Sequence, residues 1–169
     1  MIFIVYKSMS NMAEELKIRI KGYKEVEKHL EKLGARFIEE INAVDTYFKQ
    51  PKGEVLKITE DERGDFLVNL KSKDGKFRVV KYEKIDDAEK LKGELTHEFG
   101  VKCILRKRRR FFDFGGYRIN INLIEDVGEF LIVEGEGLSP EAIAKKLKIR
   151  NPEIVTVSFD EMKKRYGVA

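Results

Sequence analysis

The residues of this sequence best suited to chemistry are cations that lie in strand-like segments. Cations in such segments include Lys17, Arg19, Lys57, Lys71, Lys107, Arg109 and Arg118. Arginine forks and lysine point charges both bind phosphate oxygens well. The run from Arg106 to Arg110 is the most informative. Because adjacent strand residues point to opposite faces, at least two of its cations face the interior, where they need partners. Those partners are either protein carboxylates or an anionic ligand such as polyphosphate.

Alternating segments that could position these cations dominate the sequence. In the first, Leu16, Ile18 and Ile20 share one face, and Glu15, Lys17 and Arg19 share the other. Further strands are expected at 44–48, 54–59, 66–71, 77–85, 104–112, 117–124 and 130–136, and helices at 23–33, 86–99, 140–147 and 159–166. Hairpin turns at Lys73-Asp74-Gly75 and Gly115-Gly116 favour antiparallel pairing. About eight strands suffice to close a barrel. We therefore expect an α+β fold, an eight-stranded antiparallel β-barrel that forms a tunnel, with helices packed outside.

Composition excludes several classes of protein. The net charge is only +4 with both signs abundant, so composition alone does not indicate nucleic acid. A single cysteine, Cys103, excludes an internal disulfide, and two histidines, His29 and His97, disfavour a zinc site. No apolar run approaches the roughly 20 residues of a membrane span. We expect a cytoplasmic protein with no membrane partner, and the abundance of Lys and Glu hints at a thermophile.

An ordered set of short motifs resembles the CYTH domain family, the triphosphate tunnel enzymes that include class IV adenylyl cyclases and thiamine triphosphatases. Its opening Glu-x-Glu-x-Lys strand corresponds to Ala13-Glu14-Glu15-Leu16-Lys17. The other matching segments are Asp45-Thr46-Tyr47-Phe48, Leu56-Lys57, Leu70-Lys71, the basic run 107–112, Gly128-Glu129-Phe130 with Glu134, and Ser158-Phe159. The resemblance covers nearly the whole chain from Ala13, which suggests an N-terminal extension at 1–12 and a single domain at 13–169.

The resemblance implies a site. The cations named above would hold a triphosphate, and Glu15 and Glu134 would hold Mg²⁺ or Mn²⁺. Family carboxylates are replaced at several positions, here occupied by Ala13, Lys81, Asn122 and Ile132, and a family arginine is replaced by Thr59. Two carboxylates suffice for one magnesium ion, so one ion is expected. A register slip would instead pair Glu134 with Glu136.

Three functions follow from these residues. The first is a metal-dependent triphosphatase or class IV-like adenylyl cyclase, and the second is a protein that binds a triphosphate or nucleotide without turnover, because carboxylates are missing. The third, ranked lowest, is binding of single-stranded RNA through the basic run and Phe111, Phe112 and Phe114. Basic groups in a lumen favour the first two, and basic groups outside favour the third. The sequence leaves a monomer and a homodimer both open.

Overall fold

The computed structural model describes residues 14–166, with side chains described as far as residue 163. The expected extension at 1–12, together with Ala13, lies outside the described residues. The strands are β1 (Glu14–Ile20), β2 (Arg36–Phe48), β3 (Glu54–Asp61), β4 (Gly64–Lys73), β5 (Lys76–Ile85), β6 (Val101–Phe114), β7 (Tyr117–Ile124), β8 (Gly128–Gly135) and β9 (Glu153–Val155). The helices of this part are α2 (Tyr23–Lys32), α3 (Ala88–Phe99), α4 (Pro140–Lys146) and α5 (Phe159–Tyr166).

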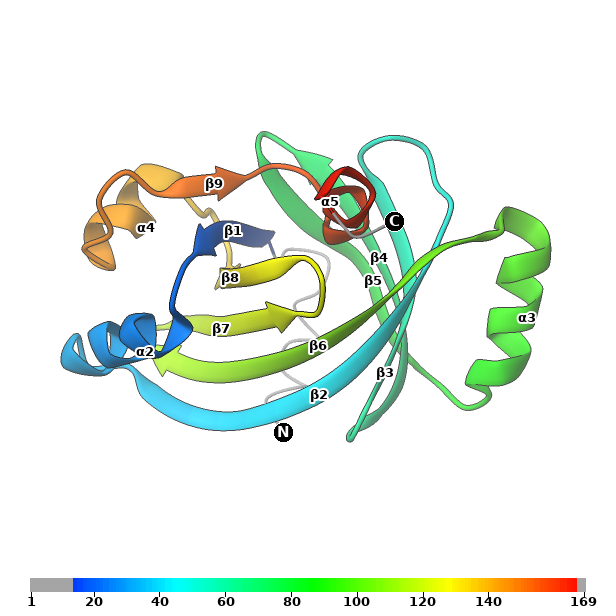
Figure 1. The fold of residues 1–169 in the computed structure, drawn as a ribbon, viewed down its shortest axis with the longest axis horizontal. Coiled ribbons are helices and arrows are strands. Elements are labelled where there is room, and N and C mark those ends of the chain that lie inside the picture. Colours follow the sequence, from blue (N-terminus) through cyan, green and yellow to red (C-terminus); the bar gives the residue numbers. More distant parts are fainter. Residues whose placement is uncertain (1–13, 167–169) are drawn as a thin grey trace.

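Eight of these strands close into an antiparallel barrel, as the sequence predicts (Figure 1). The order β5-β4-β3-β2-β6-β7-β8-β1 returns to its start through pairing of β1 with β5. That closing seam is short, since it joins Glu14 to Arg78 and Glu15 to Phe77. β9 adds to the outer edge of β1 through residues 17–19 and takes no part in the closure.

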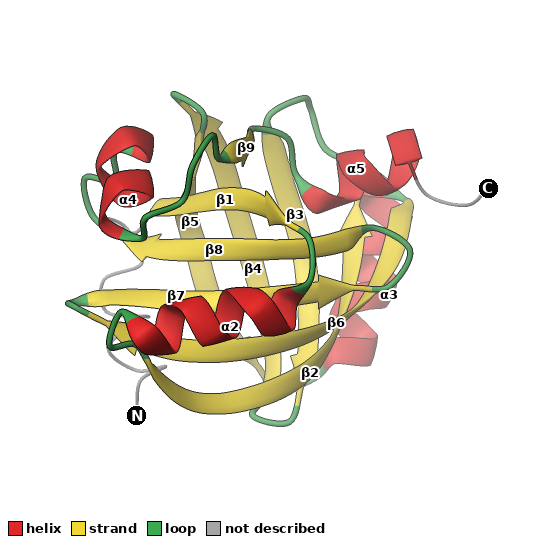
Figure 2. Ribbon diagram, turned by 60° about the vertical axis from the view of Figure 1, so that its left-hand side comes forward, coloured by secondary structure: helices red, strands yellow, loops and turns green. Residues whose placement is uncertain are grey.

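The alternation of side chains divides the barrel into an outer and an inner surface. Leu16 and Ile18 of β1 join an outer cluster with Leu131 and Val133 of β8. The helix α2 packs there through Leu30, and α4 adds Ile143. On the opposite flank, Ala88 and other α3 residues cover a second outer cluster. Figure 2 shows α2 lying along β6 and β7 on the near side of the barrel, with α3 farther back at its right-hand end. α2, α3 and α4 therefore pack outside the barrel, and the inward face of each strand lines the lumen.

One helix instead contributes to the interior. Phe159 and Met162 of α5 belong to the inner cluster, together with Phe77 of β5 and Phe130 of β8. Lys102 of β6 holds the helix from outside through an ion pair of 2.8 Å with Asp160. α5 thus closes part of the barrel next to the first half of β6.

Most predicted elements form close to their expected bounds, and the turn at Asp74-Gly75 has the positive φ angles of a tight hairpin. β2 is longer than expected, because residues 36–43 pair along β6 despite a bulge between Phe37 and Glu39. The pairing of this segment depends on β6, which is distant in the sequence, and residues 36–43 show little alternation of apolar and polar side chains. β9 was not predicted, since three residues are too few to show a pattern. Within the described residues, no helix is long and apolar enough to cross a membrane.

Candidate functional site

The barrel lumen brings most of the predicted site residues together. Two adjoining cavities inside it share walls formed by Glu15, Lys57, Leu70, Arg109 and Glu134. The remaining polar lining comprises Lys17, Tyr47, Thr59, Arg63, Tyr82, Lys107, Arg118, Asn120, Asn122 and Ser158. Five of the seven predicted phosphate-binding cations are therefore in one place: Lys17, Lys57, Lys107, Arg109 and Arg118.

The basic run on β6 is divided between the two faces of the strand. Lys107 and Arg109 line the lumen, whereas Arg106 and Arg108 border a groove on the outside. The outward Arg110 is held by Glu27 and Glu40, each at 2.8 Å. Simple alternation along an extended strand produces this division.

Two predicted cations lie elsewhere. Arg19 shares the inner face of β1 but sits at its end, where it pairs with Glu153 of β9 at 2.8 Å and stacks over Phe130. Lys71 lies on the outer face of β4 because Leu70 points inward, and it is paired with Glu54 at 3.5 Å. Its side chain is 58% exposed, so the structure does not bring Lys71 together with the lumen cations.

An aspartate occupies the space between two lumen lysines. The Asp45 Oδ2 atom lies 2.5 Å from Lys107 Nζ and 2.8 Å from Lys57 Nζ, and Lys107 also donates to the Tyr47 hydroxyl at 2.7 Å. Burial alone would raise the pKa of Asp45, but Lys107 and Lys57 hold it well below its usual range. Burial lowers the pKa of Lys107 to about 7, although Asp45 opposes that shift. The group is a compact, ionised cluster.

Two other lumen cations have no such partner. Lys17 is buried, with its Nζ atom 4.0 Å from the Phe77 ring centroid and 4.2 Å from that of Phe159. Arg109 stacks over Phe111 at 5.2 Å. Among the described side chains, no carboxylate oxygen lies within 4 Å of either cation. Burial lowers the pKa of Lys17 to about 8. Enclosed cations without carboxylates are expensive, and a bound anion would relieve that cost.

The two predicted metal ligands face each other across the β1–β8 pair. Glu15 stands directly opposite Glu134 in the antiparallel register. Burial, and then the charge of Glu15, raise the pKa of Glu134 to about 7, against the opposing effect of Arg118 at 3.8 Å. Like charges placed directly across a strand pair are destabilising. The pair is suited to share a proton or a cation.

This pair predicts a pH dependence of stability. The pKa of Glu134 rises on folding from 4.5 to about 7, so the folded state holds a proton that the unfolded chain has released. The free energy of unfolding should therefore fall between these pH values, by about 3 kcal/mol from this group. We expect Glu134→Gln to flatten that decline in denaturant titrations from pH 4.5 to pH 8. An unchanged slope in the variant would contradict the assignment.

The oxygen atoms around Glu134 fit a divalent cation. Glu134 Oε2, Asn120 Oδ1 and Asn122 Oδ1 are buried and accept no hydrogen bond. Carboxylate and amide oxygens are the ligands of hard cations such as Mg²⁺. With Glu15 opposite, Glu134 and Asn120, whose amide nitrogen donates to Glu134 Oε1 at 3.1 Å, could hold one ion. Asn122 pairs with Phe130, four residues along β8 from Glu134, and so lies apart from this site. The described residues contain no cluster of three or more His, Cys, Asp or Glu side chains, so the donor set does not suit two ions.

The alternative pairing of Glu134 with Glu136 does not form. β8 ends at Gly135, and Glu136 follows it as an exposed residue. Asn120 was missed as a candidate ligand, although its position two residues before Asn122 on a polar face could have indicated it.

Two further lumen residues escaped the sequence analysis. Arg63 follows the end of β3, and it pairs at 3.1 Å with Asp61, whose side chain is 0% exposed. Tyr82 faces inward because a register shift opposite Asn69 and Leu70 leaves one extra residue in β5. Neither feature has a local sequence signal.

The lumen is narrow. Its two cavities measure about 40 and 30 Å³. A water molecule occupies roughly 30 Å³ of the liquid, so the free space suits a few atoms only. A triphosphate would therefore require lining side chains to move apart.

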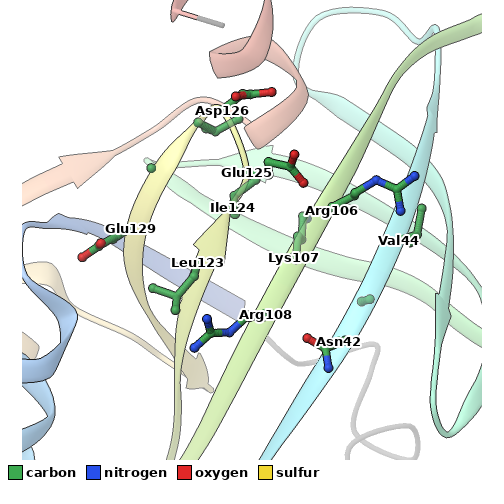
Figure 3. Close-up of a pocket in the computed structure, with 13 residues that line it drawn as sticks. Asn42, Val44, Arg106, Lys107, Arg108, Leu123, Ile124, Glu125, Asp126 and Glu129 are labelled. Atoms are coloured by element: carbon green, nitrogen blue, oxygen red, sulfur yellow. The ribbon is translucent and has the colours of Figure 1, made fainter.

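The larger groove lies on the outside of the barrel, over β2, β6 and the β7–β8 turn, and measures about 760 Å³ (Figure 3). Its lining includes Arg106 and Arg108 together with Glu125 and Asp126. Mixed charge of this kind does not form the continuous basic surface typical of proteins that bind nucleic acids.

Comparisons with known proteins agree with this architecture. The CYTH domain matches residues 12–161. The PH1012 protein of Pyrococcus horikoshii is 22% identical, with a TM-score of 0.77 over 89% of this chain and 99% of its own. A proposed adenylate cyclase of Vibrio parahaemolyticus is 15% identical, with a TM-score of 0.68 over 92% and 99%.

HpAC1 of Hippeastrum, a proposed adenylyl cyclase with a dominant triphosphatase activity, is 14% identical, with a TM-score of 0.63 over 94% of this chain and 98% of its own. At these identities, the structural likeness concerns the fold alone. A search of the curated proteins finds no match. The match to the family over nearly the whole described barrel identifies this chain as a member of the CYTH domain family.

Proposed function

We propose that the lumen binds a triphosphate-containing ligand and, with one Mg²⁺ or Mn²⁺ ion at Glu15 and Glu134, hydrolyses or cyclises it. The observation that carries this proposal is the pair of enclosed cations, Lys17 and Arg109, with no carboxylate within 4 Å among the described residues. Membership of a family of triphosphate tunnel enzymes supports the same ligand class.

The lumen residues would act by holding phosphate oxygens. Lys57 and Arg109 line both cavities. Arg118 lines the first cavity, and Lys17 and Lys107 line the second, next to Phe159. Fixed cations in an enclosed site stabilise charge that develops on transferring phosphoryl oxygens. A bound divalent ion would supply further charge neutralisation at those oxygens.

The attacking group would decide the reaction. Water at the γ-phosphorus gives phosphate and a diphosphate, as in a triphosphatase. A ribose 3′-hydroxyl at the α-phosphorus gives a cyclic nucleotide and pyrophosphate, as in a cyclase. Both reactions need the same cations, so the proposal covers both.

A specific observation favours binding without turnover as the second candidate. Asn120 supplies an amide oxygen next to the paired glutamates, and amides bind divalent ions more weakly than carboxylates do. A weakly held ion would leave an anion-binding tunnel without efficient catalysis.

Calorimetric titration with tripolyphosphate and with ATP, each with and without Mg²⁺ or Mn²⁺, tests both candidates. We expect metal to strengthen binding and product analysis of the same samples to find phosphate, pyrophosphate or cyclic nucleotide. Binding without product would support the second candidate. No binding of either compound would contradict the proposal.

A further inference from the structure

Asp45 lies deep in the tunnel, where an anion would be expected to compete with a phosphate ligand. Asp45 is 1% exposed, and its Oδ2 atom contacts the ammonium groups of both Lys57 and Lys107. The Tyr47 hydroxyl lies 3.4 Å from the same oxygen and donates to it. The other oxygen, Oδ1, is buried and has no hydrogen-bond partner. Asp45 is therefore bound to cations on one side only.

Elementary electrostatics shows what Asp45 does for the two lysines. Two ammonium groups that contact one oxygen atom are close enough to repel each other strongly in an enclosed site. Without the carboxylate between them, one lysine would lose its proton or turn away. With Asp45 present, both amines stay together and face the lumen.

The other lumen cations provide a contrast within the same molecule. Lys17 is held between two aromatic rings, and Arg109 stacks on a third. Neither depends on a carboxylate for its place. Lys57 and Lys107 are therefore the lumen cations that share a protein carboxylate in the absence of a ligand.

We propose that Asp45 is a positioning residue, a resident counter-anion that keeps Lys57 and Lys107 together and favours the charged form of Lys107 in the empty tunnel, so that both amines are placed for a phosphate oxygen. This inference rests on the proposed function for its ligand, but the arrangement of the free protein is tested separately. Holding the two amines in place beforehand would lower the cost of ordering them on binding.

Several other charged groups face Lys107 and must be considered in its titration. Lys57 on β3 and Arg109 on β6 lower its pKa, and Asp45 on β2 raises it. Tyr47 contacts it from β2, and its pKa is raised well above the ordinary value by burial and by Asp45, so it stays neutral. The Lys107 Nζ atom also lies 4.8 Å from the Phe159 ring centroid. Further titratable groups nearby are Lys17, Glu15, Glu134, Cys103 and Asp160. Of all these groups, Asp45 alone has a carboxylate in contact with Lys107 in the described structure.

The first test is the titration of lysine amines in the free protein by NMR, for wild type and Asp45→Asn. The wild-type Lys107 amine should titrate near pH 7, in line with its lowered pKa. We expect the variant to move that midpoint down by at least about one pH unit, because the stabilising charge is gone. Glu54→Gln, which removes the same charge from the outer pair with Lys71, should leave Lys107 unchanged. An unchanged Lys107 midpoint in Asp45→Asn would overturn the proposal.

The second test is tripolyphosphate binding at pH 8, without metal. Asp45→Asn should bind at least about tenfold more weakly than wild type, because the Lys107 amine then carries a proton in about tenfold fewer molecules at this pH, and the difference should shrink at pH 6. In a Lys107→Gln background, Asp45→Asn should lose most of this effect. Equal or tighter binding by Asp45→Asn at pH 8 would mean that Asp45 only competes with the ligand, which would also overturn the proposal.

These outcomes separate the two proposals. If wild type binds no tripolyphosphate, the proposed function fails, while the NMR titration still decides the role of Asp45. Thermal unfolding verifies that each variant is folded, and Asp45→Ser replaces Asp45→Asn in both tests if the asparagine variant does not fold.

Discussion

Replacing Arg109 with glutamine is expected to weaken tripolyphosphate binding by about 100-fold or more, because losing one partner of an enclosed charged contact typically costs 2–5 kcal/mol. Arg109 lines both lumen cavities and has no carboxylate within 4 Å among the described side chains. The charge it carries in the empty tunnel is therefore not neutralised by direct contact. We expect the melting temperature of Arg109→Gln to stay level or rise, because an enclosed cation without a partner is removed. Calorimetry and thermal unfolding of the same samples measure both effects.

Arg108 provides a matched control on the opposite face of the same strand. It is an exposed residue, paired with Glu40 at 3.4 Å, and it borders the outer groove. Arg108→Gln should leave tripolyphosphate binding within about twofold of wild type, since exposed ion pairs contribute little. Equal losses of tripolyphosphate affinity in the two variants would mean that the net charge of the protein controls binding, and not the position of Arg109 in the lumen. A loss confined to Arg108→Gln would place the ligand outside the barrel.

The second large effect is expected for Glu15→Gln. Glu15 and Glu134 are directly opposed across β1 and β8 and form the carboxylate pair of the candidate metal site. With one of its two carboxylates removed, the site should lose most of its affinity for a divalent ion. We expect the strengthening of tripolyphosphate binding by Mg²⁺ to fall at least about tenfold, while binding without metal is kept or improved, because one negative charge has left the lumen. Titrations with and without Mg²⁺ measure the difference.

Glu136→Gln controls for the alternative pairing. Glu136 follows the end of β8 and is exposed, so its neutralisation should not alter the metal effect. If Glu136→Gln removes the metal effect and Glu15→Gln does not, the ion is held at the end of β8 and our assignment is wrong.

Period-two alternation made the barrel and much of its lining predictable. On β1, the same pattern that placed Leu16 and Ile18 together also placed Glu15 and Lys17 on the opposite face. The division of the basic run followed from the same geometry, without knowledge of which strands pair. Local periodicity is a strong signal wherever one face of a strand is apolar.

Properties that depend on tertiary pairing could not be predicted in this way. Lys71 directly follows a leucine in a strand, as Lys57 does. Leu70 points into the barrel, however, so the side chain of Lys71 lies outside. The contact of Asp45 with two lysines joins residues from three strands, and no local pattern records it. Arg63 reaches the lumen from a turn, where alternation no longer applies.

The position of β1 has a consequence for biosynthesis. This first described strand pairs with β8 over residues 129–135, and within residues 14–166 its seam with β5 joins two residue pairs. During synthesis, β1 emerges before the other strands of the barrel but finds its main partner only after β8 has left the ribosome. Because β1 carries Glu15 and Lys17, the lumen acquires its opposed carboxylates and one of its cations in the same late event. Nascent chains that stop before β8 would therefore lack the complete anion site, which ties ligand binding to completion of the barrel.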